Sequence, residues 1–469
     1  MSLSVFACLR RAASIPAALL FLGALGAPAW AQFETRATSP FPEGAYSIAT
    51  GDFNHDGKLD VVMMTTDGLS VALGNGDGTF GKVVSYTTQL SYSLAVADFN
   101  GDGNLDIVTA DETLNPSTVS VYLGKGDGTF NPVPITSNTT SYNEFVAVGD
   151  FNGDGKPDVV LIENPHVSVL LGNGDGTFGP PSDNDSFVGV HWLTVADFNN
   201  DGKPDVLATG FFGGSDSIGI FLGNGDGTLQ NAIIANAEFV PSTVAAADLN
   251  GDGKMDAILS YDLGGVAVFL GNGDGTLQSP VQYATTGVSG EEVLVNDLNL
   301  DGKLDVAIGA GDGVDVFWGN GDGSLELAQH FSAGHSGLLA IGDLNLDHLP
   351  DVVMGTFFYG AVTMLNTGVV SFSPTTELTF KKQKHGTISA PQTVTLTNTG
   401  RSTLTISSVV ANGQFGVTTN CKPQVAPGAK CVLQVTFKPK TQGVKSGTVS
   451  INGSASKKPE VIALSGNGT

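Results

Sequence analysis

The chain has 469 residues and a formal net charge of −25, with 63 glycines and 41% hydrophobic residues. This apolar content excludes a disordered chain, and the glycine content favours an all-β protein with many tight turns, divided into two domains at this length. Residues 32–369 carry 44 acidic and 8 basic side chains, a net charge of −36, which excludes nucleic acid as a partner and favours cations.

The first 31 residues have the pattern of a signal peptide. Arg10 and Arg11 form its positive start, residues 15–26 are apolar, and Ala29-Trp30-Ala31 is a small-residue cleavage site. A membrane anchor is the alternative, but this apolar segment is shorter than the ~20 residues that span a bilayer. We found no other candidate transmembrane segment in the sequence. We therefore predict a secreted, monomeric protein that is extracellular, at the cell surface or periplasmic.

From residue 52 onward the motif D-x-N-x-D-x-x-x-D recurs seven times, at intervals of 46 to 52 residues. This period is typical of a β-propeller with four strands in each blade, whereas helical repeats show apolar residues at a spacing of about 3.6. In the first repeat the strand candidates are residues 47–51, 61–65, 69–73 and 80–87. We predict a seven-bladed β-propeller at residues 32–369.

Six repeats carry a glycine-rich turn between their third and fourth strands, the first at residues 74–78. Repetition between short strands identifies these turns as hairpins and not phosphate-binding loops. The seventh repeat lacks both this turn and its fourth strand. Because Phe33 stands 19 residues before Asp52, as outer-strand residues do elsewhere, we predict that residues 33–39 supply the missing strand and close the ring.

Each motif places side-chain oxygens at positions 1, 3, 5 and 9 of a short loop. Calcium takes about six to eight oxygen ligands, and the position-7 carbonyl can add one. A single copy could be an ordinary Asp/Asn-rich turn, but seven with unbroken spacing favour metal. We predict about one calcium ion per blade, up to seven, and expect the lysines at position 7 to point to solvent. The predicted ligands are Asp52, Asn54, Asp56, Asp60; Asp98, Asn100, Asp102, Asp106; Asp150, Asn152, Asp154, Asp158; Asp197, Asn199, Asp201, Asp205; Asp248, Asn250, Asp252, Asp256; Asp297, Asn299, Asp301, Asp305; and Asp343, Asn345, Asp347, Asp351.

These repeats resemble FG-GAP/VCBS repeats, the family of the integrin α-subunit propeller, whose calcium motif is the D-x-N-x-D-G-x-x-D loop. The resemblance covers residues 33–369 and implies a propeller fold that binds calcium. It implies no particular ligand, because a fold does not dictate a site. The last loop departs from the motif, since His348 stands where the other loops have glycine.

Residues 370–469 carry a net charge of +9 and contain short alternating strands such as residues 392–396. This pattern predicts an immunoglobulin-like β-sandwich. Cys421 and Cys431 are the only cysteines beyond the signal peptide, and such a pair in an exported protein predicts one disulfide. The domain resembles the abnormal-spindle/Hydin-like modules of exported bacterial proteins. Its charge suits docking on an anionic cell surface or on the propeller, or only solubility.

In a propeller of this kind the metal loops and glycine turns share one face, and sequence variety concentrates on the opposite face, here called the ligand face. Aromatic and carboxylate side chains commonly line carbohydrate- or protein-binding surfaces. We predict a ligand-binding or adhesion module for an extracellular glycan or protein, and not an enzyme. The alternative is a polysaccharide lyase in which Glu144, His191 and Glu291 converge, although hydrolase motifs are absent. The candidate ligand-binding residues are Tyr46, Tyr92, Glu144, His191, Trp192, Phe211, Glu291, Phe357 and Tyr359.

Overall fold

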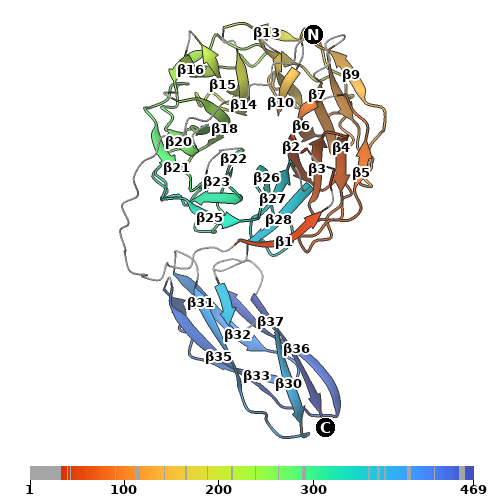
Figure 1. Cartoon of the computed structure of the whole chain (residues 1–469), viewed down its shortest axis with the longest axis vertical. Coiled ribbons are helices and arrows are strands. Elements are labelled where there is room, and N and C mark those ends of the chain that lie inside the picture. Colours follow the sequence, from red (N-terminus) through yellow and green to blue (C-terminus); the bar gives the residue numbers. More distant parts are fainter. Residues whose placement is uncertain are drawn as a thin grey trace, which may run out of the picture.

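The computed structural model describes residues 33–469, with gaps at residues 40, 43, 90, 112–116, 142, 164–165, 187–188, 213–214, 238, 262–263, 288–291, 358–359, 367–369, 374–376, 399–402, 427 and 454–459. The predicted signal peptide lies outside these described residues. The described chain is all β, as predicted: a ring of sheets is followed by a β-rich C-terminal region (Figure 1). Its described part holds no helix with the length and apolarity to cross a bilayer.

Four-stranded sheets repeat around the ring, and in six of them the strands follow chain order (Figure 1). The first three of these sheets consist of β2 (Ser47–Gly51), β3 (Asp60–Thr65), β4 (Gly68–Ala72) and β5 (Val84–Tyr86); β6 (Ser91–Ala97), β7 (Asp106–Asp111), β8 (Thr118–Tyr122) and β9 (Ile135–Asn138); and β10 (Asn143–Gly149), β11 (Asp158–Glu163), β12 (His166–Leu170) and β13 (Ser182–Asn184). The next three consist of β14 (Val190–Ala196), β15 (Asp205–Phe212), β16 (Ser215–Phe221) and β17 (Ile233–Asn236); β18 (Pro241–Ala247), β19 (Asp256–Tyr261), β20 (Gly265–Phe269) and β21 (Val281–Ala284); and β22 (Val293–Asn296), β23 (Asp305–Ala310), β24 (Gly313–Phe317) and β25 (Gln329–Ser332).

The remaining sheet of the ring joins the two ends of the repeat region. It contains β26 (Gly337–Gly342), β27 (Asp351–Thr356) and β28 (Gly360–Asn366), and its outer strand is β1 (Phe33–Ser39). β1 pairs with β28 in antiparallel register, with Phe33 opposite Asn366. The prediction that residues 33–39 close the ring is therefore confirmed. A ring closed in this way leaves no unpaired blade between its first and last repeats.

The hydrophobic cores of the ring lie between neighbouring sheets. All six residues of β3 are buried, because the adjacent blades cover both faces of each sheet. In one such core Val108 of β7 packs in the same cluster as Val146 of β10 and Leu161 of β11. Burial of a side chain of this size stabilises the fold by about 1.5–3 kcal/mol. The innermost strands surround the axis (Figure 1) and carry small side chains such as Ala95 and Ala147.

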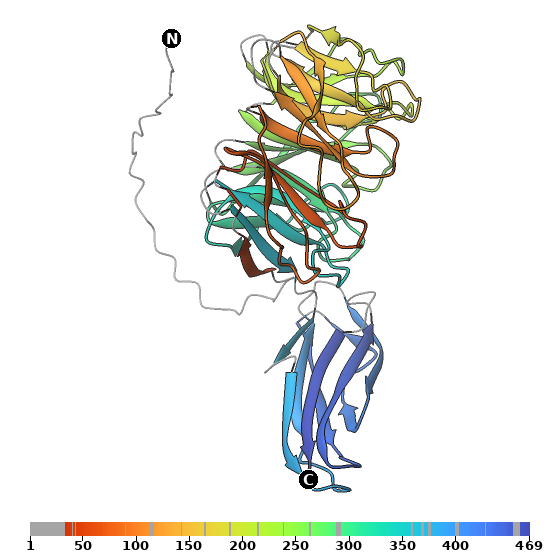
Figure 2. The same cartoon turned by 90° about the vertical axis from the view of Figure 1, so that its right-hand side faces the viewer.

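The C-terminal region forms two further sheets that share no strand with the ring (Figure 2). One contains β29 (Val370–Ser373), β31 (Gln392–Asn398), β35 (Lys430–Phe437) and β33 (Phe415–Thr419); the other contains β30 (Glu377–Gln383), β37 (Glu460–Gly468), β36 (Gly443–Gly453), β32 (Leu404–Ala411) and β34 (Gln424–Val425). A separate core of its own, including Leu396, Val435 and Ile462, lies between them.

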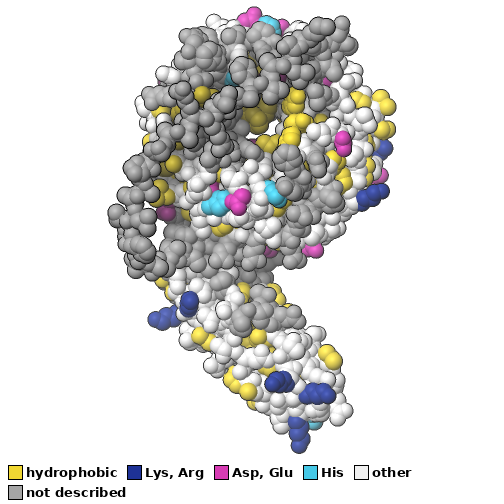
Figure 3. Space-filling model, viewed as in Figure 1, with side chains coloured by type: hydrophobic (Ala, Val, Ile, Leu, Met, Phe, Trp, Pro, Cys, Tyr) yellow, Lys and Arg dark blue, Asp and Glu magenta, His cyan; other side chains and the backbone are white. Residues whose placement is uncertain are grey.

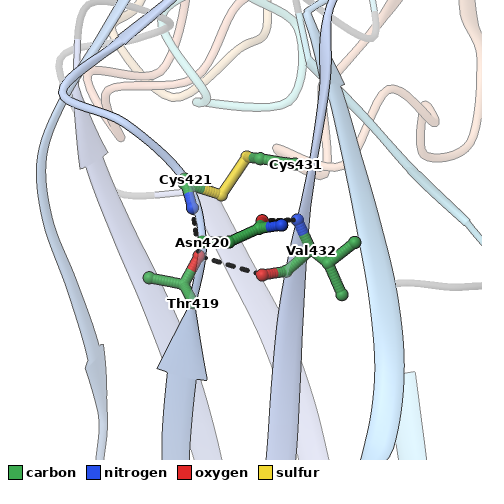
Figure 4. Close-up of a disulfide and its surroundings, with 5 residues drawn as sticks. All are labelled: Thr419, Asn420, Cys421, Cys431 and Val432. Atoms are coloured by element: carbon green, nitrogen blue, oxygen red, sulfur yellow. Dashed lines mark hydrogen bonds between the residues drawn. A yellow bond between two sulfur atoms is a disulfide. The ribbon is translucent and has the colours of Figure 1, made fainter.

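The predicted disulfide joins Cys421 to Cys431 (Figure 4). Hydrogen bonds fasten the chain beside it: Val432 N donates to Asn420 Oδ1 at 2.6 Å, and Thr419 Oγ1 donates to the carbonyl of Val432 at 3.0 Å. The bridge therefore lies within the C-terminal region and ties the segment after β33 to the start of β35.

Candidate metal loops and ligand face

The seven Asp-rich loops all connect the first strand of a blade to the second, and the position-9 aspartate begins that second strand. Their backbones turn sharply because positions 4 and 6 both adopt positive φ, as at His55 (58°) and Gly57 (78°). Glycine adopts such angles without strain, and Asn and His tolerate them better than branched residues. Leu300, Leu346 and His348 therefore carry more backbone strain than the glycines at equivalent positions.

Within each loop, the carboxylate and amide oxygens at positions 1 and 3 accept hydrogen bonds from the backbone. In the first loop Asp56 N donates to Asp52 Oδ1 at 3.1 Å and to Asn54 Oδ1 at 3.0 Å, while Gly57 N donates to Asp52 Oδ2 at 2.9 Å. The same bonds recur in other loops, for example from Asp252 N to Asp248 and Asn250. These bonds hold the side-chain oxygens of positions 1 and 3 against the loop.

The position-9 aspartate has a structural task in addition to its predicted metal role. Asp60 is fully buried, and its Oδ2 accepts a bond from Phe53 N at 2.9 Å while Oδ1 accepts one from Gly74 N at 2.8 Å. Equivalent pairs of bonds occur at all seven position-9 aspartates, with Asn366 N replacing the glycine in the last blade. Through these two hydrogen bonds the side chain joins the Asp-rich loop to the turn after the third strand.

Each loop brings several carboxylates together with little positive charge nearby to balance them. Burial raises the pKa of Asp305 and of Asp351, and the aspartates at positions 1 and 5 of the same loops add to this effect, so that the pKa is about 7 for Asp305 and about 8 for Asp351. The same causes raise the pKa of Asp106 and Asp205 to about 6. Repulsion of this kind is relieved by a cation, so the charge distribution of the loops fits a metal ion.

The donor set also fits calcium chemically, since every predicted ligand is a hard oxygen. Within the described residues, however, no group of three or more His, Cys, Asp or Glu side chains is gathered as a ready-made metal cage. Four of the position-7 lysines are partly exposed and lie beside a carboxylate of their own loop. Lys58 Nζ lies 3.0 Å from Asp56 Oδ2, and Lys156, Lys203 and Lys254 pair with position-5 aspartates in the same way. The ammonium group is drawn to the nearest carboxylate of its own loop.

The glycine turns lie beside the metal loops, as predicted. A Cβ on Gly76 would come within 2.9 Å of Lys58 Cδ, so the lysine side chain covers a turn that needs glycine there (φ 75°). In five blades the glycine turn also reaches the loop of the preceding blade: Gly128 N, for example, donates to the carbonyl of Phe53 at 3.0 Å. In the first blade, Gly78 N donates to the carbonyl of Leu344, which joins this face of the ring across its closure.

On the ligand face, three of the candidate aromatic residues come together from three different blades. The Tyr46 ring lies 4.9 Å from that of Tyr92 and 6.0 Å from that of Phe357, both edge to face. Tyr92 is 37% exposed and Phe357 is 48% exposed. The structure therefore forms an aromatic cluster, Tyr46, Tyr92 and Phe357, that is partly open to solvent.

The other ligand-face candidates divide into those that line the axis and those that do not. Trp192 packs against Phe145, with ring centroids 4.4 Å apart, and both line a cavity of about 420 Å³ among the innermost strands, together with Glu292. Glu144 is half-buried and His191 is exposed, and no hydrogen bond joins them in the described structure. Phe211 belongs to β15. Glu291 and Tyr359 lie outside the described residues.

One polar cluster on this side of the ring was missed by the sequence analysis. His330 Nδ1 lies 2.7 Å from Asp315 Oδ1, and its Nε2 lies 2.7 Å from Asp312 Oδ1. Burial lowers the pKa of His330, but the two carboxylates outweigh burial and raise it above its ordinary value. Asp312 and Asp315 lie in and just after a turn, and nothing in the sequence indicates that His330 of the next strand would lie between them. Histidine and acidic side chains also group beside the central opening, which hydrophobic side chains border (Figure 3).

Comparisons with known proteins agree with this architecture. No curated protein matches the chain. Among solved structures, BBS1N in complex with ARL6DN, in mercury-soaked and lead-soaked forms, matches 71% of this chain and 97% of its own, at 12% and 13% identity and TM-scores of 0.52 and 0.51. An Agrocybe aegerita lectin that recognises non-reducing terminal N-acetylglucosamine matches 60% of this chain and 78% of its own, at 24% identity and a TM-score of 0.45.

Two family models match the chain itself. Residues 371–468 match a protein family of unknown function, DUF1573. An FG-GAP-like repeat matches five times, at residues 52–109, 98–161, 150–208, 197–259 and 297–354. These five matches cover more than half of the chain, and each begins at an Asp-rich loop of the ring and ends in the second strand of the next blade. The chain therefore belongs to the family of FG-GAP-like repeat proteins.

Proposed function

We propose that this chain is a secreted, calcium-binding propeller that holds an extracellular glycan or protein at its ligand face. The observation that carries this proposal is the aromatic cluster of Tyr46, Tyr92 and Phe357. Partly exposed aromatic side chains offer a large apolar contact area at low entropic cost, which suits sugar faces and protein side chains alike. The role is one of binding, in keeping with the FG-GAP-like family.

We assign calcium to the seven loops and regard the propeller as integrin α-subunit-like. The oxygen donors, their regular spacing and the raised pKa values of the position-9 aspartates support this assignment. Seven divalent ions would reduce the net charge of residues 32–369 from −36 to −22 and so relieve self-repulsion. The position-7 lysines that now pair with position-5 aspartates would turn outward when an ion takes those carboxylates.

For the C-terminal region we propose an abnormal-spindle/Hydin-like sandwich that attaches the propeller to an anionic surface. Its net charge of +9 supports this role, because basic side chains attract anionic polymers. The disulfide between Cys421 and Cys431 is compatible with export to an oxidising compartment.

Retention of the mature protein on immobilised polysaccharides and on cell envelopes, in millimolar calcium and in EDTA, tests the proposal. We expect retention on at least one of these in calcium and its loss in EDTA. Tyr92→Ala and Phe357→Ala should each weaken retention about tenfold, the effect of losing roughly 1.4 kcal/mol of contact energy. Leu327→Ala is the matched control, since Leu327 is 87% exposed and lies away from the aromatic cluster.

Two outcomes would contradict the proposal. The first is retention that both aromatic variants leave unchanged, which would move the binding surface elsewhere. The second is the release of unsaturated sugar products from a polysaccharide without retention, because that reaction belongs to a lyase.

A further inference from the structure

One end of the C-terminal region carries six of its eleven basic residues. This end lies on the far side of the region from the ring, beside the C-terminus (Figure 2), and the chain reaches it after β30 and after β35. Backbone hydrogen bonds join the segments that meet there: Gly386 N donates to the carbonyl of Pro439 at 2.9 Å, and His385 N donates to that of Thr469 at 2.8 Å. We call this end the distal tip. Its lysines, all exposed except for the half-buried last one, are Lys381, Lys382, Lys384, Lys438, Lys440 and Lys445.

The two acidic residues of the C-terminal region stand at the opposite end from the distal tip. Glu377 begins β30 and Glu460 begins β37, and these two strands run parallel. Lys384 stands seven residues after Glu377, which is about 23 Å along an extended strand at roughly 3.3 Å per residue. All lysine ion pairs of the described structure lie in the metal loops of the ring. The positive charge of the distal tip is therefore left for a partner outside the chain, and Figure 3 shows dark blue side chains but no magenta ones on this end.

Two exposed aliphatic side chains lie among these lysines. Ile388 is 60% exposed and Val444 is 76% exposed. Ile388 follows β30, and its neighbour Ser389 donates its N–H to the carbonyl of Phe437, the last residue of β35, at 2.9 Å. Val444 lies near the start of β36 and directly precedes Lys445. The distal tip thus combines positive charge with apolar surface that the chain itself does not cover.

This combination favours a lipid bilayer over an anionic polysaccharide as the partner. Lysine side chains are attracted to anionic headgroups, and aliphatic side chains leave water when they enter the boundary between headgroups and acyl chains. A polysaccharide offers no such apolar layer, and surfaces that bind sugars commonly use aromatic side chains. Residues 381–390 and 438–446, which form the distal tip, contain no Phe, Tyr or Trp.

We propose that the distal tip docks on a bilayer that contains anionic phospholipids, with its lysines at the headgroups and with Ile388 and Val444 inserted beneath them. This inference rests on the proposed attachment of the C-terminal region to an anionic surface, and it specifies both the surface and the end of the region that meets it. The position of the tip also suits the charge of the ring. Because electrostatic interactions in water fade over about 8 Å at physiological ionic strength, the length of the C-terminal region keeps the acidic ring from being repelled by the bilayer.

Co-sedimentation of the full mature protein with vesicles, in millimolar calcium, tests the proposal. We expect binding to vesicles of phosphatidylcholine and phosphatidylglycerol in equal parts, and none to vesicles of phosphatidylcholine alone. The double variant Lys384→Gln/Lys440→Gln should bind roughly 30-fold more weakly, the loss expected for two lysines near an anionic membrane. Ile388→Ser/Val444→Ser should also bind more weakly, although its charge is unchanged.

The matched control is Lys422→Gln/Lys430→Gln. These two exposed lysines flank the disulfide at the other end of the C-terminal region, so this variant loses the same charge without changing the distal tip. It should bind the mixed vesicles as the wild type does.

Three outcomes would overturn the inference. Equal weakening by the tip and control pairs would mean that the region attaches through its net charge alone, and the proposed attachment would survive without the distal tip. Displacement by free inorganic phosphate, with full binding of Ile388→Ser/Val444→Ser, would mean that the tip recognises phosphate groups and not a bilayer. Absence of binding to the mixed vesicles would exclude the lipid surface, and the proposed attachment itself would fail only if the protein also bound no anionic polysaccharide.

Discussion

At the residue scale, position 4 of each Asp-rich loop has a left-handed backbone conformation, so the side chain at this position determines how much the conformation reduces the stability of the fold. Leu300 occupies this position with φ 55° and is 40% exposed. Asn200 has the same conformation in the fourth blade, and its Nδ2 donates to the carbonyl of Gly253 in the next loop at 2.9 Å. We predict that Leu300→Asn stabilises the protein by about 0.5–1 kcal/mol, because Asn tolerates left-handed angles better than Leu.

Urea unfolding at a fixed calcium concentration measures this effect. Gly101 is the reciprocal control, since it stands at position 4 of the second loop with φ 72°. Gly101→Leu should destabilise the protein by roughly 1–2 kcal/mol. Equal midpoints for Leu300→Asn and the wild type would mean that the loop relaxes around leucine without strain.

A second residue-scale prediction concerns His330, which lies between Asp312 and Asp315. Its pKa is raised above the ordinary value of 6.5, because the two carboxylates outweigh the opposing effect of burial. The interaction therefore contributes fully below about pH 6.5, and the contribution is lost as the pH rises through the folded-state pKa. We expect the melting temperature of the wild type to fall more than that of His330→Gln between pH 6 and pH 8. Parallel pH profiles of the two proteins would contradict this prediction.

At the element scale, variants of the position-9 aspartate distinguish its structural role from its proposed role in metal binding. Asp158→Ala leaves Phe151 N and Gly172 N without their acceptor, and each buried unpaired group costs about 1–3 kcal/mol. We predict that Asp158→Ala destabilises the fold by roughly 3 kcal/mol even at the lowest calcium concentration at which the wild type folds. Asp154→Ala in the same loop should destabilise far less under that condition, because Asp154 is exposed. If chemical denaturation showed the same loss in free energy of unfolding for Asp158→Ala and Asp154→Ala, Asp158 would have no separate structural role.

The strands of the ring could be predicted closely because the same pattern of strands and turns recurs in each repeat. The first repeat illustrates this: strand candidates at residues 61–65 and 69–73 correspond to β3 (Asp60–Thr65) and β4 (Gly68–Ala72). The fourth strand was predicted too long, at residues 80–87, whereas β5 contains only Val84–Tyr86 and Phe80 forms a bridge to Gly74. Local turn chemistry gives the element, but contacts made after the chain turns back decide its length.

Contacts between repeats were harder to predict than the repeats themselves. The position-9 aspartates carried an obvious ligand pattern, yet their bonds to backbone N–H groups depend on the fold of each blade. Tyr46, Tyr92 and Phe357 were proposed only as members of one face. Tyr46 and Tyr92 come from consecutive blades, whereas the contact of Tyr46 with Phe357 depends on ring closure, which brings residues near both ends of the repeat region together.

At the scale of the whole molecule, the acidic charge of residues 32–369 makes calcium the expected determinant of stability. Each site that binds only the folded protein adds about 2.7 kcal/mol when calcium is at 100 times its dissociation constant. Because neighbouring blades share their cores and their loop–turn hydrogen bonds, we expect that the loss of a proposed calcium ion from one loop would weaken the adjoining blade as well.

The most direct test is the thermal unfolding of the mature protein in millimolar calcium and in EDTA, followed by calorimetry. We predict a propeller transition that shifts to a much lower temperature in EDTA and returns when calcium is restored, while the C-terminal region, whose core is separate, changes little. Equal melting temperatures in calcium and in EDTA would contradict a calcium-binding propeller and leave the seven loops as hydrogen-bonded turns.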